Sequence, residues 1–235
     1  MTSLSFYLKV LKKIALGFFK SKRGKFTYKD LICEGLSILE LLKQMGCPII
    51  IQGKENLKEA DSTCVFVANH MSTLETFVLP AVLGEKFRVT FVVKDSLLRY
   101  PFFNEILKTL KPIAVTRRNP KEDYKVVMQE GVKRIKDGVS VVVFPQATRE
   151  IIFNPDKFNT LGVKLAQKAD VQLIPIALRT DAWAVGKIFK DFGRIDPTKP
   201  ICFFIGRPIK IEGKGLKEHL QIIDFIRQSL AKCYN

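Results

Sequence analysis

From Pro48 onward, short runs of apolar and β-branched residues alternate with longer segments of helical periodicity. A chain that alternates strands and helices in this way places its strands in parallel and packs the helices over them. The pattern therefore predicts an α/β fold with a largely parallel central sheet flanked by helices. Gly53 and Gly138 stand where elements of this pattern end. The predicted strands are 49–52, 63–68, 88–93, 112–116, 139–144, 171–178 and 201–206, and the predicted helices are 73–83, 101–110, 120–137, 158–169 and 216–233.

Two polar residues after the apolar run 65–68 are the first candidates for a functional site. His70 follows Asn69 directly, and Glu75 comes five residues later. An imidazole at a strand end accepts a proton near neutral pH, and a nearby carboxylate fixes its tautomer and stabilises the imidazolium. The pair predicts a general base with its orienting acid, and a nucleophile that the substrate supplies. A simpler interpretation, a helix-capping Asn69 followed by surface polar residues, stays open at this point.

A second polar loop follows the apolar run 141–144. It contains Gln146, Thr148 and Arg149, which offer an amide, a hydroxyl and a guanidinium group. In open α/β sheets, ligands bind beyond the carboxyl ends of the strands. We therefore expect this loop and His70 to meet in one crevice.

Four blocks of sequence, taken in their order, give the strongest functional signal. Asn-His followed by an acid occupies 69–75, and Lys-Asp-Ser-Leu leads to an Arg in 94–117. Phe-Pro-Gln-Ala-Thr-Arg occupies 144–149, and a strand with an internal Pro occupies 174–178. These blocks resemble the motifs of the glycerolipid acyltransferase family. Its lysophosphatidic acid acyltransferase-like members move a fatty acyl chain from a thioester to a lipid hydroxyl, and the resemblance spans residues 49–208.

Three positions depart from the family pattern. Glu75 stands where the family has Asp, which lengthens the side chain by one methylene and keeps the carboxylate. Gln146 stands in place of a Glu and removes a charge where the resemblance places the acceptor. Ala147 replaces a Gly, and this restricts the access of the loop backbone to positive φ. The last two changes bear on which acceptor the chain would use.

The resemblance implies an O-acyltransferase whose acyl donor is acyl-CoA or acyl-carrier protein. The acceptor it implies is a lysophospholipid, foremost 1-acyl-glycerol-3-phosphate, which would give phosphatidate. It assigns His70 as the catalytic base and Glu75 as its partner, with no cofactor and no metal ion. Arg117 and Arg149 would hold the acceptor phosphate, because guanidinium binds phosphate through paired donors.

Other roles are expected or left open by the same residues. Gln146 and Thr148 are expected to bind substrate or to close the loop. Ser72 and Thr73 lie close to the base and are alternative nucleophiles for an acyl-enzyme, although no nucleophile-elbow motif surrounds them. A different lyso-lipid acceptor and a non-catalytic, membrane-binding relative are the rival functions. Apolar residues in 95–107, namely Leu97, Leu98, Tyr100, Phe102 and Phe103, are candidate walls for the acyl chain.

Residues 1–47 differ in character from the rest of the chain. Helices are predicted over 3–20 and 28–45, and the second ends at Gly46. The first combines a lysine-rich sector with leucines and phenylalanines outside it. One interpretation is an ordinary pair of packed helices. The other, which the charge and aromatic content favour, is a membrane-associating helical hairpin (1–47) ahead of an α/β acyltransferase domain (48–235).

The whole chain has a formal net charge of +16 at pH 7, from 39 Lys and Arg against 23 Asp and Glu. Such a surface attracts polyanions. Because the basic residues accompany large apolar side chains and lack a stacking platform, we expect an anionic membrane surface and no nucleic-acid partner. No stretch of 18 apolar residues is present. The expected location is therefore peripheral or monotopic, on the cytoplasmic face of a membrane.

Five scattered cysteines form no Cys-x-x-Cys pair and accompany only two histidines. This pattern argues against a structural zinc site, and reduced thiols are expected. The second histidine, His219, falls in the polar part of the predicted C-terminal helix, where a surface position is expected. Trp183, just after a predicted strand, is expected to pack in the core or at an interface.

Overall fold

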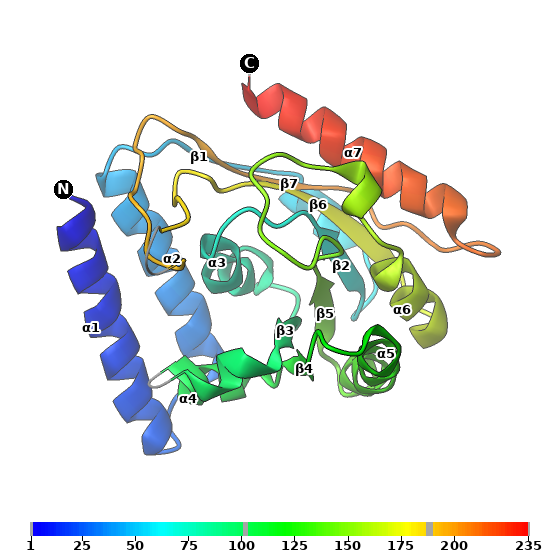
Figure 1. Ribbon diagram of the computed structural model, residues 1–235, viewed down its shortest axis with the longest axis horizontal. Coiled ribbons are helices and arrows are strands. Elements are labelled where there is room, and N and C mark those ends of the chain that lie inside the picture. The colour runs from blue at the N-terminus through cyan, green and yellow to red at the C-terminus, as the bar shows by residue number, and fades with distance from the viewer. Residues whose placement is uncertain (1, 101–102, 187–189, 235) are drawn as a thin grey trace.

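One central sheet organises the molecule in the computed structural model, which describes residues 2–100, 103–186 and 190–234 (Figure 1). Its seven strands lie in the order β1-β7-β6-β2-β5-β3-β4. Neighbouring strands are parallel except for β6 and β7, which are antiparallel. The strands are β1 (Ile49–Gln52), β2 (Val65–Ala68), β3 (Val89–Lys94), β4 (Ile113–Val115), β5 (Ser140–Val143), β6 (Leu173–Arg179) and β7 (Ile201–Ile205). The predicted α/β fold with a largely parallel sheet is confirmed.

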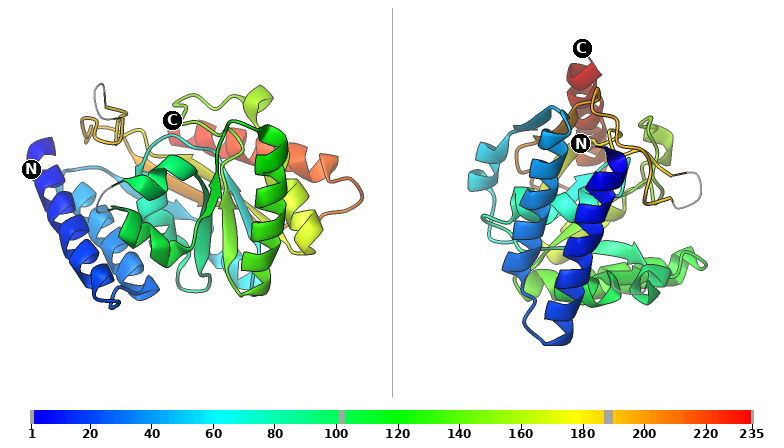
Figure 2. Two further views of the ribbon diagram at one scale, coloured as in Figure 1. Left: turned by 60° about the horizontal axis from the view of Figure 1, so that its bottom comes forward. Right: turned by 90° about the vertical axis from the view of Figure 1, so that its left-hand side faces the viewer.

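Helices cover both faces of this sheet (Figure 2). Successive side chains of a strand point to opposite faces, so Phe66 and Val142 join the core beneath α1–α4. Val65 and Val141 join a second core beneath α5–α7. The helices are α1 (Ser3–Lys22), α2 (Tyr28–Gln44), α3 (Leu74–Leu83), α4 (Phe103–Leu110), α5 (Pro120–Lys136), α6 (Leu161–Ala169) and α7 (Leu216–Tyr234). The first two residues of the helix predicted over 101–110 lie outside the described residues.

The two N-terminal helices share the core of the sheet. Phe6 of α1 and Leu42 of α2 are fully buried in the same cluster as Phe66 of β2. Thr27 and Asp30 form a reciprocal capping box that fixes where α2 begins. None of the helices, within the described residues, is long and apolar enough to cross a bilayer.

The outer face of α1 carries large apolar side chains beside exposed lysines. Five large side chains on this helix are exposed, and they are Leu4, Leu8, Leu11, Leu16 and Phe19. Three residues on its inner face are buried, and they are Phe6, Val10 and Gly17. The helix therefore presents apolar side chains both to the core and to its surroundings.

Two expectations about single residues are wrong. His219 is buried rather than on the surface: its ring stacks on Phe158, and burial lowers its pKa. Cys202 of β7 and Cys233 of α7 form a disulfide instead of two reduced thiols, with 7.0 Å between their Cα atoms. Trp183 is buried in the core, as expected.

Gly35 gives a test of how α2 packs against α3. A Cβ atom at this position would lie 2.8 Å from both the Phe77 carbonyl oxygen and the Ala81 Cβ of α3. Gly35→Ala should therefore lower the free energy of unfolding by about 1–3 kcal/mol, despite the better helix propensity of alanine. Chemical denaturation would measure this, with Cys33→Ala at an exposed position of the same helix as control. Equal stabilities of the two variants would contradict this packing.

Candidate active site

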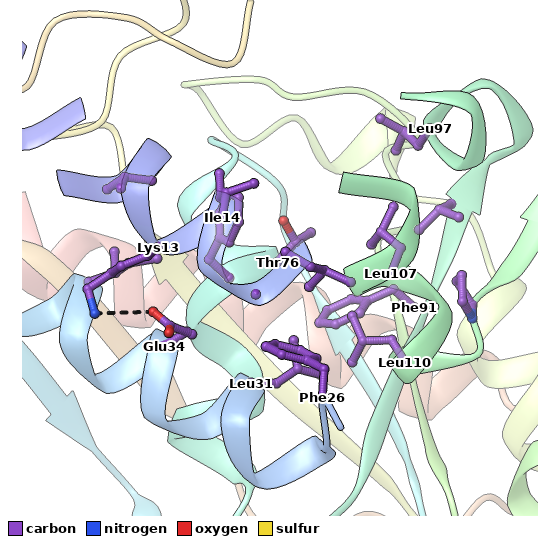
Figure 3. Close-up of a pocket in the computed structure, with 17 residues that line it drawn as sticks. Lys13, Ile14, Phe26, Leu31, Glu34, Thr76, Phe91, Leu97, Leu107 and Leu110 are labelled. Carbon is purple, nitrogen blue, oxygen red and sulfur yellow. Dashed lines mark ion pairs between the residues drawn. The ribbon is translucent and has the colours of Figure 1, made fainter. Parts of the chain in front are cut away.

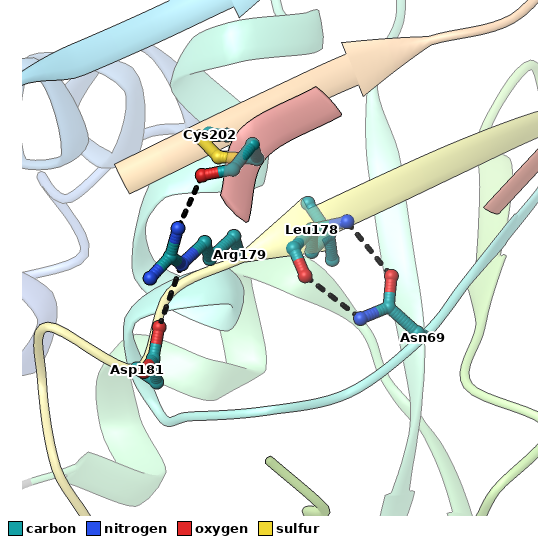
Figure 4. The surroundings of a disulfide bond; sticks show 6 residues. Asn69, Leu178, Arg179, Asp181 and Cys202 are labelled. Atoms are coloured by element: carbon teal, nitrogen blue, oxygen red, sulfur yellow. Dashed lines mark hydrogen bonds and ion pairs between the residues drawn. A yellow bond between two sulfur atoms is a disulfide. The ribbon is translucent and has the colours of Figure 1, made fainter. Parts of the chain in front are cut away.

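The loop between β2 and α3 is fixed by Asn69. The side-chain NH₂ group of Asn69 donates to the Leu178 carbonyl, and its side-chain oxygen Oδ1 accepts from the Leu178 N–H, each at 2.7 Å (Figure 4). Ala68 already pairs with Ile176 in the sheet, so Asn69 extends the link between β2 and β6 beyond the end of β2. Asn69 is buried and serves as a strand clamp, not as the helix cap that the simpler interpretation assigned to it.

Glu75, in the first turn of α3, is the most densely hydrogen-bonded side chain of this loop. It is fully buried, and its Oε1 atom accepts from the Met71 N–H at 2.8 Å and the Ser72 N–H at 3.0 Å. The Thr180 hydroxyl, which follows β6, donates to the same oxygen. The other oxygen, Oε2, is paired with Nδ1 of His70. Because a carboxylate accepts, the imidazole proton lies on Nδ1 and the lone pair on Nε2.

The His70 ring is also held by packing and by its backbone. It stacks on Phe144, the residue after β5, with 4.3 Å between ring centroids and 18° between planes. The His70 N–H donates to Oε1 of Gln146 at 3.2 Å, and its carbonyl accepts from the Glu150 N–H at 2.8 Å. The structure thus brings His70, Glu75 and Gln146 together, and the two strand-end loops meet as predicted.

His70 opens onto a cavity of about 520 Å³ at the carboxyl ends of the strands. Its walls come from the end of β3, from Val115 of β4, from Val143 and Phe144, and from the start of α5. Arg117 lies on the wall of the same cavity. The polar base and the apolar strand ends therefore face one space.

Asp123, in the first turn of α5, sets the position of Arg117. Its carboxylate accepts from the Thr116 N–H at 2.8 Å and from the Arg117 N–H at 2.7 Å. The clamp accompanies a left-handed backbone at Arg117, with φ of 58°. Burial lowers the pKa of Arg117, and the nearby positive charge of Arg149 lowers it further. The two guanidinium groups are therefore close enough to repel each other.

Arg149 is engaged within the protein. Its Nη1 atom contacts Oδ1 of Asp191 at 2.8 Å and the hydroxyl of Thr73, and its side chain is 22% exposed. It is not among the described residues that line the cavity of about 520 Å³. Thr148 is exposed and does not line that cavity either. Gln146 is buried, and its Nε2 atom has no hydrogen-bond partner among the described residues.

The loop backbone at Ala147 adopts φ of 62°. This is the left-handed region that glycine adopts more easily. The replacement of a Gly by Ala therefore leaves the turn itself in place, and it adds a methyl group to a residue that lines the cavity.

A smaller apolar cavity of about 80 Å³ lies between α1, α2 and α4 (Figure 3). The Lys13–Glu34 ion pair, at 3.2 Å, marks one side of it. Three apolar residues, Phe91, Val93 and Leu97, line both cavities. The apolar space beneath the N-terminal helices thus adjoins the cavity that His70 faces.

The acyltransferase family model matches residues 48–179, which is more than half of the chain. The chain belongs to the acyltransferase family. The matched segment contains the β2–α3 loop, Arg117 and the loop after β5. The resemblance drawn from the four motifs is therefore confirmed.

Curated relatives are similar over part of their length. A 1-acyl-sn-glycerol-3-phosphate acyltransferase of Pseudomonas aeruginosa is 33% identical over 70% of this chain and 60% of that protein. Its counterpart in Borreliella burgdorferi is 29% identical over 57% of this chain and 52% of that protein. The chain thus spans between half and three fifths of these two relatives.

A solved structure matches nearly the whole fold. The crystal structure of the 1-acyl-sn-glycerophosphate acyltransferase from Thermotoga maritima gives a TM-score of 0.74. The match covers 98% of this chain and 93% of that one, at 20% sequence identity. The architecture, including the N-terminal helices, is therefore shared with that protein.

Three acidic or hydroxyl side chains of the site were not found from the sequence. Thr180 and Asp191 follow β6 and reach the β2–α3 loop from more than a hundred residues away. Asp123 acts through backbone N–H groups, and its only local signal is an acid in the first turn of a helix. A turn-plus-acid pattern at 116–123 was available in the sequence, whereas the contacts of Thr180 and Asp191 depend on the tertiary fold.

Asp123→Ala tests the clamp on the turn that carries Arg117. Loss of two amide hydrogen bonds should speed exchange of the Thr116 and Arg117 N–H groups by roughly tenfold or more. Hydrogen-exchange mass spectrometry or NMR would measure this. Glu122→Ala removes an acid from the same helical turn and is the control. Similar exchange at this turn in both variants would show that Asp123 does not hold it.

Proposed function

We propose that the chain is an O-acyltransferase that moves a fatty acyl group from acyl-CoA or acyl-carrier protein to the free hydroxyl of a lysophospholipid. The acceptor we favour is 1-acyl-glycerol-3-phosphate, with phosphatidate as product. One observation carries the proposal: the His70 ring, held by Glu75 and Phe144, faces a cavity that also bears Arg117. The names of the relatives in Pseudomonas aeruginosa and Borreliella burgdorferi agree with it.

In this proposal His70 acts as the general base. Nε2 takes the proton of the acceptor hydroxyl as its oxygen attacks the thioester carbonyl. When the tetrahedral intermediate collapses, the thiolate leaves and takes this proton from the imidazolium, which returns His70 to its neutral form. Glu75 keeps the lone pair on Nε2 and stabilises the imidazolium that forms. The protein needs no cofactor for this sequence of steps, because the thioester supplies an activated acyl group.

Direct attack by the acceptor fits the contacts of the nearby hydroxyl groups. Ser72 is buried, and its Oγ accepts from the Leu74 N–H at 3.2 Å, which gives it a role at the start of α3. The Thr73 hydroxyl is bound to Arg149 and Asp191. Among the described contacts neither hydroxyl is hydrogen-bonded to His70, and the Asp191 carboxylate that Thr73 contacts is paired with Arg149, so these contacts do not favour an acyl-enzyme on Ser72 or Thr73.

Two arginines are the proposed phosphate ligands, and they differ in setting. Arg117 lines the cavity, whereas Arg149 lies beside the β2–α3 loop and is paired with Asp191. A phosphate between them would relieve their mutual repulsion. Gln146 and Thr148 remain proposed acceptor contacts, with Gln146 already fixed by the His70 N–H.

We propose the smaller cavity as the entry of the acyl chain. It is walled by apolar residues of α1, α2 and α4 and adjoins the larger cavity. Leu97 lines both cavities, in line with its proposed place among the acyl-chain walls. Phe102 lies outside the described residues, and nothing is described of the Phe103 side chain.

A different lyso-lipid acceptor is the second candidate. The observation that favours it is Gln146, a neutral and buried side chain where the family pattern has Glu. Transfer to a panel of lyso-lipids with and without a phosphate monoester would decide between the two acceptors.

The first experiment compares acyl transfer by the wild type and by His70→Ala. Loss of the base should lower the turnover of lysophosphatidate about 10²–10⁴-fold while circular dichroism shows an intact fold. His219→Gln, at the other histidine of the chain, is the control and should keep its activity near neutral pH. Wild-type activity in folded His70→Ala would rule out this role for His70.

We further propose that α1 lies on an anionic membrane surface, with a peripheral or monotopic attachment on the cytoplasmic face. Its exposed leucines offer apolar area, and its lysines attract acidic headgroups. In this arrangement the acceptor enters the site from the lipid layer.

Vesicle binding tests this surface. Replacing Leu8 and Leu11 together with Gln should weaken binding to phosphatidylcholine–phosphatidylglycerol vesicles by roughly 10²-fold or more, because two exposed leucines that would enter the lipid layer are lost. Leu216 and Leu220 of α7 are similarly exposed, lie on the other side of the sheet, and provide the matched double variant. Co-sedimentation would measure vesicle binding. An equal loss of binding in the two double variants would contradict a specific membrane face on α1.

A further inference from the structure

Asp191 is the acid that pairs with Arg149 beside the β2–α3 loop. Its Oδ1 atom accepts from Nη1 of Arg149 at 2.8 Å and from the Thr73 hydroxyl at 2.9 Å. The Lys190 carbonyl lies 3.5 Å from the same Nη1 atom. A guanidinium and a hydroxyl converging on one oxygen form a donor set that also suits a phosphate oxygen. Asp191 thus occupies the position where Arg149 would receive the acceptor phosphate.

A ligand can reach the ion pair between Arg149 and Asp191. The Arg149 and Asp191 side chains are 22% and 30% exposed, so solvent and a ligand can reach the pair. The positive charge of Arg149 lowers the pKa of Arg117, and the carboxylates of Asp123 and Asp191 offset part of the charge on these two guanidinium groups. A phosphate monoester, with a charge of about −1.5 to −2 near neutral pH, would neutralise both. A phosphodiester headgroup carries one negative charge and has less to gain.

The backbone around Asp191 is held in place by Trp183 and by α1. The Trp183 indole N–H donates to the Asp191 carbonyl at 2.9 Å. The Tyr7 hydroxyl donates to the Gly193 carbonyl, and the Tyr7 and Phe192 rings meet edge to face at 5.4 Å. The segment 190–193 is therefore fixed against the N-terminal helix and presents its acid to Arg149.

We propose that Asp191 is a specificity-determining residue, a resident anion that competes with the acceptor phosphate for Arg149 and Thr73. This inference rests on the proposed function and deepens it. Acceptors with a phosphate monoester displace Asp191, whereas acceptors with a diester or neutral headgroup meet an occupied arginine. Asp191 thereby raises the KM for every acceptor and raises it most for the weaker anions.

Asp191→Asn tests this competition, because the amide keeps the shape and removes the charge. The KM for lysophosphatidate should fall about threefold, as for a partly exposed ion pair, with kcat unchanged. The preference for lysophosphatidate over a lysophosphatidylglycerol acceptor should narrow. In an Arg149→Gln background, Asp191→Asn should change neither the KM for lysophosphatidate nor the preference between the two acceptors, since the two residues act as one unit. Asp224→Asn, an exposed acid of α7, controls for net charge.

Two outcomes would overturn the proposal. A higher KM in Asp191→Asn would make Asp191 a residue that positions Arg149, and an unchanged KM would leave it without effect on the acceptor. Binding of glycerol 3-phosphate, measured by calorimetry, needs no turnover and separates the two hypotheses. If the wild type transfers no acyl group, tighter binding in Asp191→Asn still supports the resident anion, and unchanged or weaker binding overturns it.

Discussion

A single buried carboxylate, that of Glu75, determines the geometry on which the site depends. A carboxylate that is removed from water is tolerated only if hydrogen bonds replace its hydration. Two backbone N–H groups, the Thr180 hydroxyl and the His70 ring supply these bonds. Each donor constrains a different part of the molecule, namely the β2–α3 loop, the end of β6 and the imidazole. The need to satisfy one charge therefore aligns the sheet, the loop and the base.

The strands, and the closeness of His70 to Glu75, could be predicted from the sequence. The strands were predictable because buried parallel strands read as short apolar runs, and His70 and Glu75 lie within one strand-to-helix turn. The non-local half was not predictable in this way. Thr180, and the Asn69 clamp on Leu178, join segments more than a hundred residues apart that only the strand order β2–β6 brings together. The burial of His219 also depends on tertiary packing, which a helical pattern does not specify.

The two arginines show how the same residue type is given different tasks by nearby acids. Asp123 accepts from backbone N–H groups, so it fixes the turn and leaves the Arg117 side chain on the cavity wall. Asp191 accepts from the guanidinium itself and takes up the charge of Arg149. From the sequence both arginines were equivalent candidates for phosphate. Only the positions of the two acids in the structure show that Arg117 faces the cavity and that Arg149 is paired with Asp191.

The N-terminal helices are coupled to this chemistry through packing. Phe6 and Tyr7 of α1 pack edge to face on Trp183, whose indole N–H holds the Asp191 backbone. Phe77 of α3 stacks on the same indole, with 14° between the ring planes. A close-packed core transmits displacements instead of absorbing them. These rings thus join α1, by direct contact, to the segment that carries Asp191, the partner of Arg149.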